Sequence, residues 1–214
     1  MKTLQICTLR AMSVVTLVAL STSCGEVART GRSPVLLVID SLEAASGASP
    51  DAFGNVLFSD VETLVPQQIN GQTVRVPTIY ADMGRAAFRL TLKNPGSATS
   101  PLGASALNEV TINRYRVTFR RADGRSAAGV DIPYPFDGAV TVTIPGTGSA
   151  SATFALVRPQ AKLEPPLSTM QRGGGANMLS TIAEVEFYGR DQAGNDIVGV
   201  ALISVNFGDF GDPQ

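Results

Sequence analysis

Histidine and tryptophan are both absent from this chain of 214 residues. Without histidine, the chain cannot form a Ser-His-Asp or Cys-His catalytic site or a histidine-ligated zinc, copper or iron centre. Without tryptophan, and with aromatic residues at only 6%, sites that stack carbohydrate or choline on aromatic rings are disfavoured. Any catalysis would depend on carboxylates, lysine, tyrosine or serine, and we expect no catalytic activity, no cofactor and no metal centre.

Cysteine occurs only at Cys7 and Cys24, and Cys7 lies in a segment with the pattern of an export signal. Residues 1–10 are basic, residues 11–20 are mostly apolar, and small residues follow. This order predicts a signal peptide over residues 1–23, because the apolar core is shorter than the ~20 residues that span a bilayer. Its removal leaves Cys24 as the single cysteine, so we expect a core that holds the fold without a disulfide.

A cysteine directly after small residues resembles the lipobox of bacterial lipoproteins. Ser21 stands where that family favours leucine, and Leu20 lies one position earlier. The resemblance implies that Cys24 becomes the first mature residue and carries acyl chains that anchor it in a membrane. Gly25 is compatible with the outer membrane in the family's sorting rule. Ser21 and Ser23 also satisfy the small-x-small rule of ordinary signal peptidase, so a soluble secreted or periplasmic protein with a free thiol stays open.

The rest of the chain is predicted to form a polar tether and one domain. Residues 24–33 lack a periodic apolar pattern, which is typical of a tether, and residues 34–214 have the length of a single domain. The loss of Lys2 and Arg10 with the signal leaves fifteen basic against eighteen acidic side chains, a net charge of −3. This balance does not favour nucleic acid. The expected partners are the membrane, through the N-terminal lipid, and a protein of the cell envelope.

Apolar and polar residues alternate with period two over much of the chain, which predicts β-strands. The alternation is clear in residues 86–92, 140–144, 152–156 and 183–188. Its inward phase predicts a core that includes Phe88, Val117, Phe119, Phe154, Val185 and Phe187.

Turn residues predict how these strands connect. The sequence Pro-Gly-Thr-Gly at residues 145–148 predicts a hairpin, as does Asp-Gly at residues 123–124, and residues 191–196 are typical of a third tight turn. The alternation slips near residues 113–114, which indicates a β-bulge or a change of sheet. Residues 197–207 are apolar on both faces, so this strand is either central and covered on both sides or has one face bound by something else.

Short strands separated by Gly, Pro, Asn and Asp predict an all-β fold, an antiparallel β-sandwich over residues 34–214. Residues 110–212 resemble the immunoglobulin-like and fibronectin type III-like domains of bacterial surface proteins in strand pattern, late hairpin and lack of a disulfide. The Cys-Trp-Cys arrangement of true immunoglobulin domains is missing. Because sandwiches host many functions, the resemblance implies a fold and no activity.

The segment of residues 158–178 is the predicted partner-binding loop. It is longer than most structureless loops, and patterned strands on both sides present it to solvent. A loop that is disordered or packed on itself stays open as the alternative. The basic and apolar side chains that would suit a protein partner are Arg158, Lys162, Leu163, Leu167, Met170 and Arg172.

Three further groups have a functional and a simpler structural interpretation. Oxygen atoms of Asp191, Asn195 and Asp196 could ligate calcium, although the same residue types are typical of a hairpin turn. Glu184 and Glu186 share a strand face and could be the two carboxylates of a glycosidase or solvated surface acids. A basic cluster could bind an anion or form ion pairs with these glutamates; its members are Arg114, Arg116, Arg120 and Arg121.

These observations favour an exported, lipid-anchored cell-envelope protein that acts as a non-catalytic interaction or structural module. The alternative is a carboxylate-based hydrolase that acts on envelope glycans.

The substitution Cys24→Ala is expected to release the protein from the membrane to the soluble fraction, because it removes the acylated side chain. Cell fractionation measures the release, and Cys7→Ala, within the signal, is the matched control that should leave the protein in the membrane. Intact-mass analysis of the unaltered protein decides the point, since a mature chain that begins at Cys24 without acyl mass contradicts lipidation.

Overall fold

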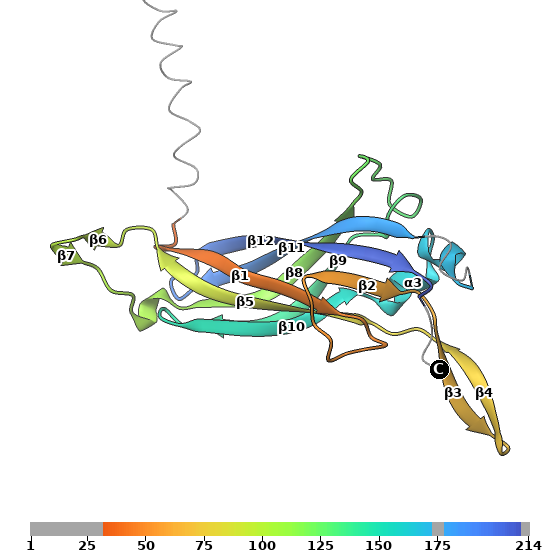
Figure 1. Ribbon diagram of the computed structural model, residues 1–214. Helices are drawn as coiled ribbons and strands as arrows, with labels where there is room; N and C mark the ends of the chain where they lie inside the picture. The colour runs from red at the N-terminus through yellow and green to blue at the C-terminus, as the bar shows by residue number, and fades with distance from the viewer. Residues whose placement is uncertain (1–31, 173–177, 211–214) are drawn as a thin grey trace, which may run out of the picture.

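The computed structural model describes residues 32–172 and 178–210 (Figure 1). The predicted signal peptide, Cys24 and all but the last two residues of the predicted tether lie outside the described residues. No helix among the described residues is long and apolar enough to cross a membrane.

The fold is all-β, with 59% of the described residues in strands and 7% in helices. A three-stranded sheet has the order β1 (Val35–Ala45), β5 (Asp82–Leu92), β10 (Ser149–Val157). A five-stranded sheet has the order β2 (Val56–Asp60), β12 (Asp196–Gly208), β11 (Leu179–Asp191), β8 (Val110–Arg120), β9 (Phe136–Ile144). The remaining elements are β3 (Thr63–Ile69), β4 (Gln72–Thr78), β6 (Gly96–Ser97), β7 (Ser100–Pro101), η1 (Ala106–Asn108), α3 (Pro159–Leu163) and η2 (Leu167–Met170).

The expectation of a wholly antiparallel arrangement is wrong at β2, which pairs with β12 in parallel. Ala44 and Gly54 form an isolated antiparallel bridge, which closes the excursion of the chain between them. Beyond this bridge, β2 points the same way as β1 and β12 in Figure 1. The chain therefore leaves the three-stranded sheet at the end of β1 and enters the five-stranded sheet at β2.

The predicted hairpin at residues 145–148 is also wrong. Strand β9 pairs with β8, whereas β10 pairs with β5, so this turn carries the chain between the two sheets. Period-two alternation shows that a strand has one buried face, but it does not identify the neighbouring strand. The Asp-Gly prediction is confirmed in part. Strands β8 and β9 do pair, but residues 121–135 connect them instead of a tight turn.

Other local predictions are confirmed. The ladder of β8 shifts register between Ile112 and Arg114 against β9, which is the expected irregularity at residues 113–114. Strands β11 and β12 form a hairpin that closes with Arg190 opposite Asp196.

The core contains every residue that the inward phase predicts. Its centre is a group of aromatic rings in which Phe187 lies 4.9 Å from Phe88 and 5.2 Å from Phe154, both edge to face. Tyr115 joins them 4.8 Å from Phe154, and its hydroxyl donates to the Ala155 carbonyl at 3.0 Å. A side chain at Gly138 would overlap the Tyr115 ring, which explains the glycine in this strand.

Strands β3 and β4 form a separate hairpin that projects from one end of the molecule (Figure 1). Its turn is Asn70-Gly71, with φ of 52° and 79°, the left-handed conformation that Asn-Gly hairpin turns adopt. This dipeptide is a local signal that the sequence interpretation did not use.

Replacing Phe187 with alanine is expected to lower the free energy of unfolding by ~3–5 kcal/mol, because the cavity left between Phe88 and Phe154 can close only in part. Chemical denaturation measures the change. Leu202→Ala on the exposed face of β12 is the control, with an expected effect within about 0.5 kcal/mol. Equal melting of the two variants would contradict the position of Phe187 in the core.

Candidate functional site

The outer face of β12 is apolar and exposed. Val198, Val200 and Leu202 are 52%, 53% and 61% exposed, while Ile203 and Val205 on the other face are buried. Strand β12 lies between β2 and β11. Within residues 32–172 and 178–210 the strand is therefore central in its sheet but covered on one face only, which excludes the possibility that the fold covers it on both sides.

This apolar face continues onto both neighbouring strands. Ser204 of β12 is paired with Val56 of β2 and with Ile182 of β11, and both partners are exposed, as is Phe58. Single exposed apolar residues are ordinary, but a contiguous patch with a polar rim is typical of an interaction site. We call this patch the β12 surface; it consists of Val56, Phe58, Ile182, Val198, Val200 and Leu202.

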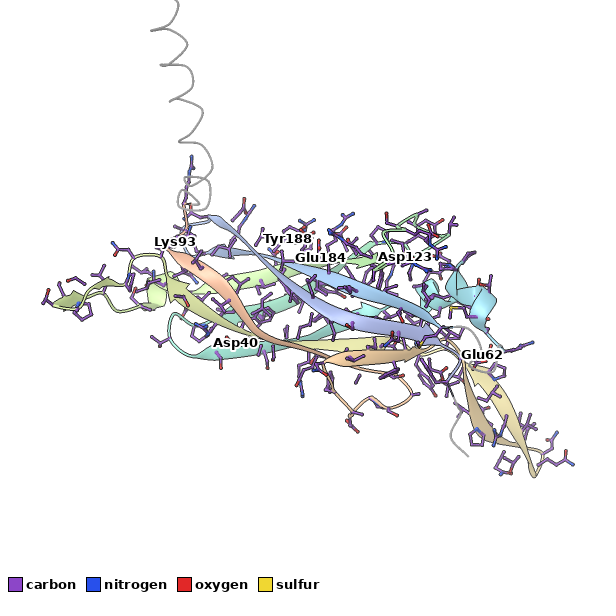
Figure 2. All side chains as sticks on the ribbon, turned by 45° about the horizontal axis from the view of Figure 1, so that its top comes forward. Asp40, Glu62, Lys93, Asp123, Glu184 and Tyr188 are labelled. Carbon is purple, nitrogen blue, oxygen red and sulfur yellow. The ribbon has the colours of Figure 1, made fainter. Side chains whose placement is uncertain are left out.

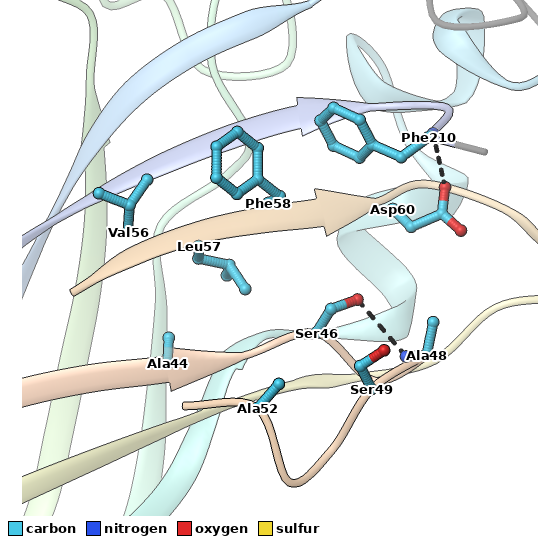
Figure 3. Close-up of a pocket in the computed structure, with 10 residues that line it drawn as sticks. All are labelled: Ala44, Ser46, Ala48, Ser49, Ala52, Val56, Leu57, Phe58, Asp60 and Phe210. Atoms are coloured by element: carbon cyan, nitrogen blue, oxygen red, sulfur yellow. Dashed lines mark hydrogen bonds between the residues drawn. The ribbon is translucent and has the colours of Figure 1, made fainter. Parts of the chain in front are cut away.

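A cleft of about 440 Å³ lies beside β2 (Figure 3). One wall comes from the end of β1 and the excursion that follows it, and all its lining side chains are small: Ala44, Ser46, Ala48, Ser49 and Ala52. The other wall is Val56, Leu57 and Phe58, and Asp60 and Phe210 line it further along the chain. Phe58 and Phe210 meet edge to face at 5.7 Å. The β2 cleft is thus continuous with the β12 surface through Val56 and Phe58.

The carboxylate of Asp60 is engaged by its own chain. It accepts hydrogen bonds from the Thr63 hydroxyl at 2.6 Å and from the Phe210 amide at 3.1 Å. Burial raises the pKa of Asp60 above its ordinary value, although these two donors and Lys162 act to lower it. Asp60 therefore holds Phe210 in place at the cleft instead of presenting a free charge to a ligand.

A buried ion pair lies behind the β2 cleft. Lys162 and Asp82 have side chains that are 1% and 0% exposed, with Nζ 2.9 Å from Oδ1. Lys162 also donates to the carbonyl of Asp60 at 2.7 Å. Asp82 accepts from the Gly47 amide at 2.9 Å and from the Ser59 hydroxyl at 2.6 Å. Burial raises the pKa of Asp82, against the opposing effect of the ammonium and of both donors.

The predicted partner-binding loop is largely structured and half of its candidate residues are buried. Lys162, Leu167 and Met170 lie in the interior, on α3 and η2, so the expectation that they contact a partner is corrected. The physical reason is the ion pair, which draws Lys162 inward together with the apolar residues that follow. The other candidates are placed as follows: Leu163 is exposed, Arg172 pairs with Glu62 at 3.5 Å, and Arg158 lies over the Phe136 ring at 4.2 Å.

The two glutamates and the basic cluster pair with one another or with neighbours. Arg120 pairs with Glu184 at 2.9 Å, as expected, and Glu186 accepts from the Tyr188 hydroxyl at 2.8 Å. Figure 2 labels Glu184 and Tyr188 on β11, the strand next to β12. The remaining cluster members also have acidic partners: Arg114 and Arg116 pair with Asp137, and Arg121 pairs with Asp123.

The possible calcium ligands form a closed hairpin turn. Asp191 accepts from the backbone amides of Ala193 and Asn195 and from the Asn195 side chain. Burial acts to raise the pKa of Asp191, but these hydrogen bonds outweigh it and lower that pKa. Asp196 pairs with Arg190 at 2.8 Å. Across the described ranges, no three acidic, cysteine or histidine side chains gather as a metal site would require.

Comparison of the chain with known protein families, with curated proteins and with solved structures finds no match. The residues of the β2 cleft were not candidates from sequence, because nothing local shows that a strand lies at the edge of a sheet. The β12 surface did have a sequence signal, since residues 197–207 are apolar on both faces and a bound face was one of the two interpretations.

Replacing Lys162 with methionine is expected to lower the free energy of unfolding by ~3–5 kcal/mol, because it leaves Asp82 buried without its partner. Arg120→Met breaks an exposed pair and is the control, with an expected cost of about 1 kcal/mol or less. The double variant Lys162→Met with Asp82→Asn should recover part of the loss, since no lone charge remains. Urea unfolding tests the series, and equal effects of Lys162→Met and Arg120→Met would refute the structural importance of the pair.

Proposed function

We propose that the protein is an exported cell-envelope protein, anchored through acyl chains on Cys24, that acts as a non-catalytic interaction module for another envelope protein. The observation that carries the proposal is the β12 surface. Its apolar side chains are not part of the core, and their exposure to water is unfavourable. Such a patch is typical of a surface that a partner covers.

The strand order supports an immunoglobulin-like β-sandwich as the scaffold of this module. The order β1, β5, β10 corresponds to strands A, B and E of that fold, and β12, β11, β8, β9 corresponds to G, F, C and C′. The aromatic core joins the two sheets, since Phe88 and Phe154 come from one and Phe187 from the other. Because sandwich scaffolds host many functions, the binding role depends on the β12 surface itself.

The direction of β1 supports a partner-binding region that lies away from the membrane. Strand β1 runs from Val35, which pairs with Leu92, to Ala45, which pairs with Met83. Its 11 residues span ~36 Å. Figure 2 shows Lys93 and Glu62 toward opposite ends of the molecule. An anchor that enters at Val35 would leave the β2 cleft and the β3–β4 hairpin on the side farther from the membrane.

The hydrolase alternative has less support from the geometry. Its two candidate acids, Glu184 and Glu186, are engaged by Arg120 and Tyr188 on a strand face, and neither lines the β2 cleft.

The substitution Val200→Lys tests the proposed surface. Val200 is paired with Glu186 across the strands, so a lysine there gains an ion-pair partner and the fold should persist, while a charge enters the apolar patch. Chemical cross-linking in native membranes, followed by quantitative mass spectrometry, should show at least about tenfold less partner, as expected for a loss of ~1.4 kcal/mol or more.

Thr118→Lys is the matched control, because Thr118 lies opposite Glu184 outside the apolar patch. It should leave partner recovery unchanged. If Val200→Lys and Thr118→Lys recover the same partners in the same amounts, the β12 surface is not the contact.

A further inference from the structure

Strand β2 forms one edge of the five-stranded sheet. Within residues 32–172 and 178–210 it pairs with β12 alone, over Val56 to Asp60. An edge strand presents backbone N–H and C=O groups along its free side, and these groups can pair with another chain.

Two hydrogen bonds show which backbone groups face that free side. The amide of Val61 donates to the Gly208 carbonyl of the β12 segment at 2.9 Å. Successive residues of a strand direct their backbone groups alternately to the two sides, so Ser59 and Leu57 also face β12. The carbonyl of Asp60 accepts from Lys162 on the opposite side, as the alternation requires. The N–H and C=O of Phe58 therefore point to the open edge.

The β2 cleft runs along this open edge. Its far wall consists of the small side chains of Ala44, Ser46, Ala48, Ser49 and Ala52, and about 440 Å³ lies between this wall and β2 (Figure 3). The cleft is lined by apolar groups and serines, and its one carboxylate, Asp60, already accepts two hydrogen bonds. The cleft therefore suits an uncharged, apolar occupant with its own backbone hydrogen-bonding groups.

The edges of the β3–β4 hairpin differ from the β2 edge because both hairpin strands contain proline. Pro66 lies on β3 and Pro77 on β4, and proline lacks the N–H that an added strand would need. Strand β2, with the sequence Val-Leu-Phe-Ser-Asp, contains no proline. The hairpin edges are protected from pairing in a way that the β2 edge is not.

We propose that the open edge of β2 binds an extended, apolar segment of the partner protein by β-strand addition. The inference rests on the proposed function and names the binding mode. The added strand exchanges hydrogen bonds with the N–H and C=O of Phe58, and its alternate side chains lie against Phe58 and Phe210 or enter the cleft.

The test uses the purified full chain and a random dodecapeptide library displayed on phage. Selected peptides are expected to carry alternating apolar residues, and the best one is then synthesised and titrated. Methylation of one central backbone nitrogen should abolish its binding, while methylation of the adjacent nitrogen should not, because alternate amides face β2. This readout needs no protein variant. A failure to select any peptide, or equal tolerance of both methylations, would overturn the proposal.

The variant Phe58→Pro removes the amide at the open edge without removing a hydrogen bond to β12, and an edge strand tolerates such a proline. Phe58→Ala is the matched control, which keeps the amide and loses the ring. Phe58→Pro should lose peptide binding, and Phe58→Ala should weaken it by less. Equal loss of binding in both variants would show that the peptide contacts only the Phe58 side chain, and would overturn strand addition. The proposal would also be overturned if sedimentation showed a wild-type dimer that Phe58→Pro dissociates.

Cross-linking in native membranes distinguishes a failure of strand addition from a failure of the proposed function. If Val200→Lys loses partners and Phe58→Pro retains them all, the interaction surface stands and strand addition fails. If neither variant loses a partner, the proposed function itself fails. Loss in both variants, with normal melting temperatures, supports both.

Discussion

The buried contact between Lys162 and Asp82 is the interaction on which one end of this molecule depends. The ammonium group reaches the carboxylate and the carbonyl of Asp60, while the carboxylate also binds Gly47 and Ser59. Four segments that are distant in sequence thus meet at one pair of charges. Such a pair is costly to desolvate and stabilises the fold only while every hydrogen bond is made, so it specifies one arrangement of these segments.

The same pair determines the shape of the β2 cleft. Asp82 holds Gly47 on one wall with one oxygen and Ser59 on the other wall with the second oxygen. The separation of the walls is therefore set by a single carboxylate. Lys162 occupies the carbonyl of Asp60, which closes one end of the β2 edge and leaves Val56 and Phe58 as the positions where a partner's backbone could pair. Three residues predicted for direct contact, Lys162, Leu167 and Met170, belong instead to the support behind the cleft.

Strand β12 places aliphatic side chains both in the core and in solvent. On β12, alternate aliphatic side chains enter the core and the others remain in solvent. The inner set packs against the opposite sheet, and the outer set has no structural counterpart among the described residues. A local departure from the usual pattern of buried apolar and exposed polar residues is expected where function, and not stability, selects the side chain.

The sequence by itself determined the strand class, the inward phase of Phe88, Phe154 and Phe187, the irregularity near residue 113 and the β11–β12 turn. These features follow from period two and from turn residues, which act over a few neighbouring positions. Only the tertiary structure decided that β9 and β10 lie in different sheets, that β2 runs parallel to β12, and that Lys162 is buried. Each of these depends on partners far away along the chain, such as Asp82 for Lys162, and no local pattern encodes which distant strand or charge will be the neighbour.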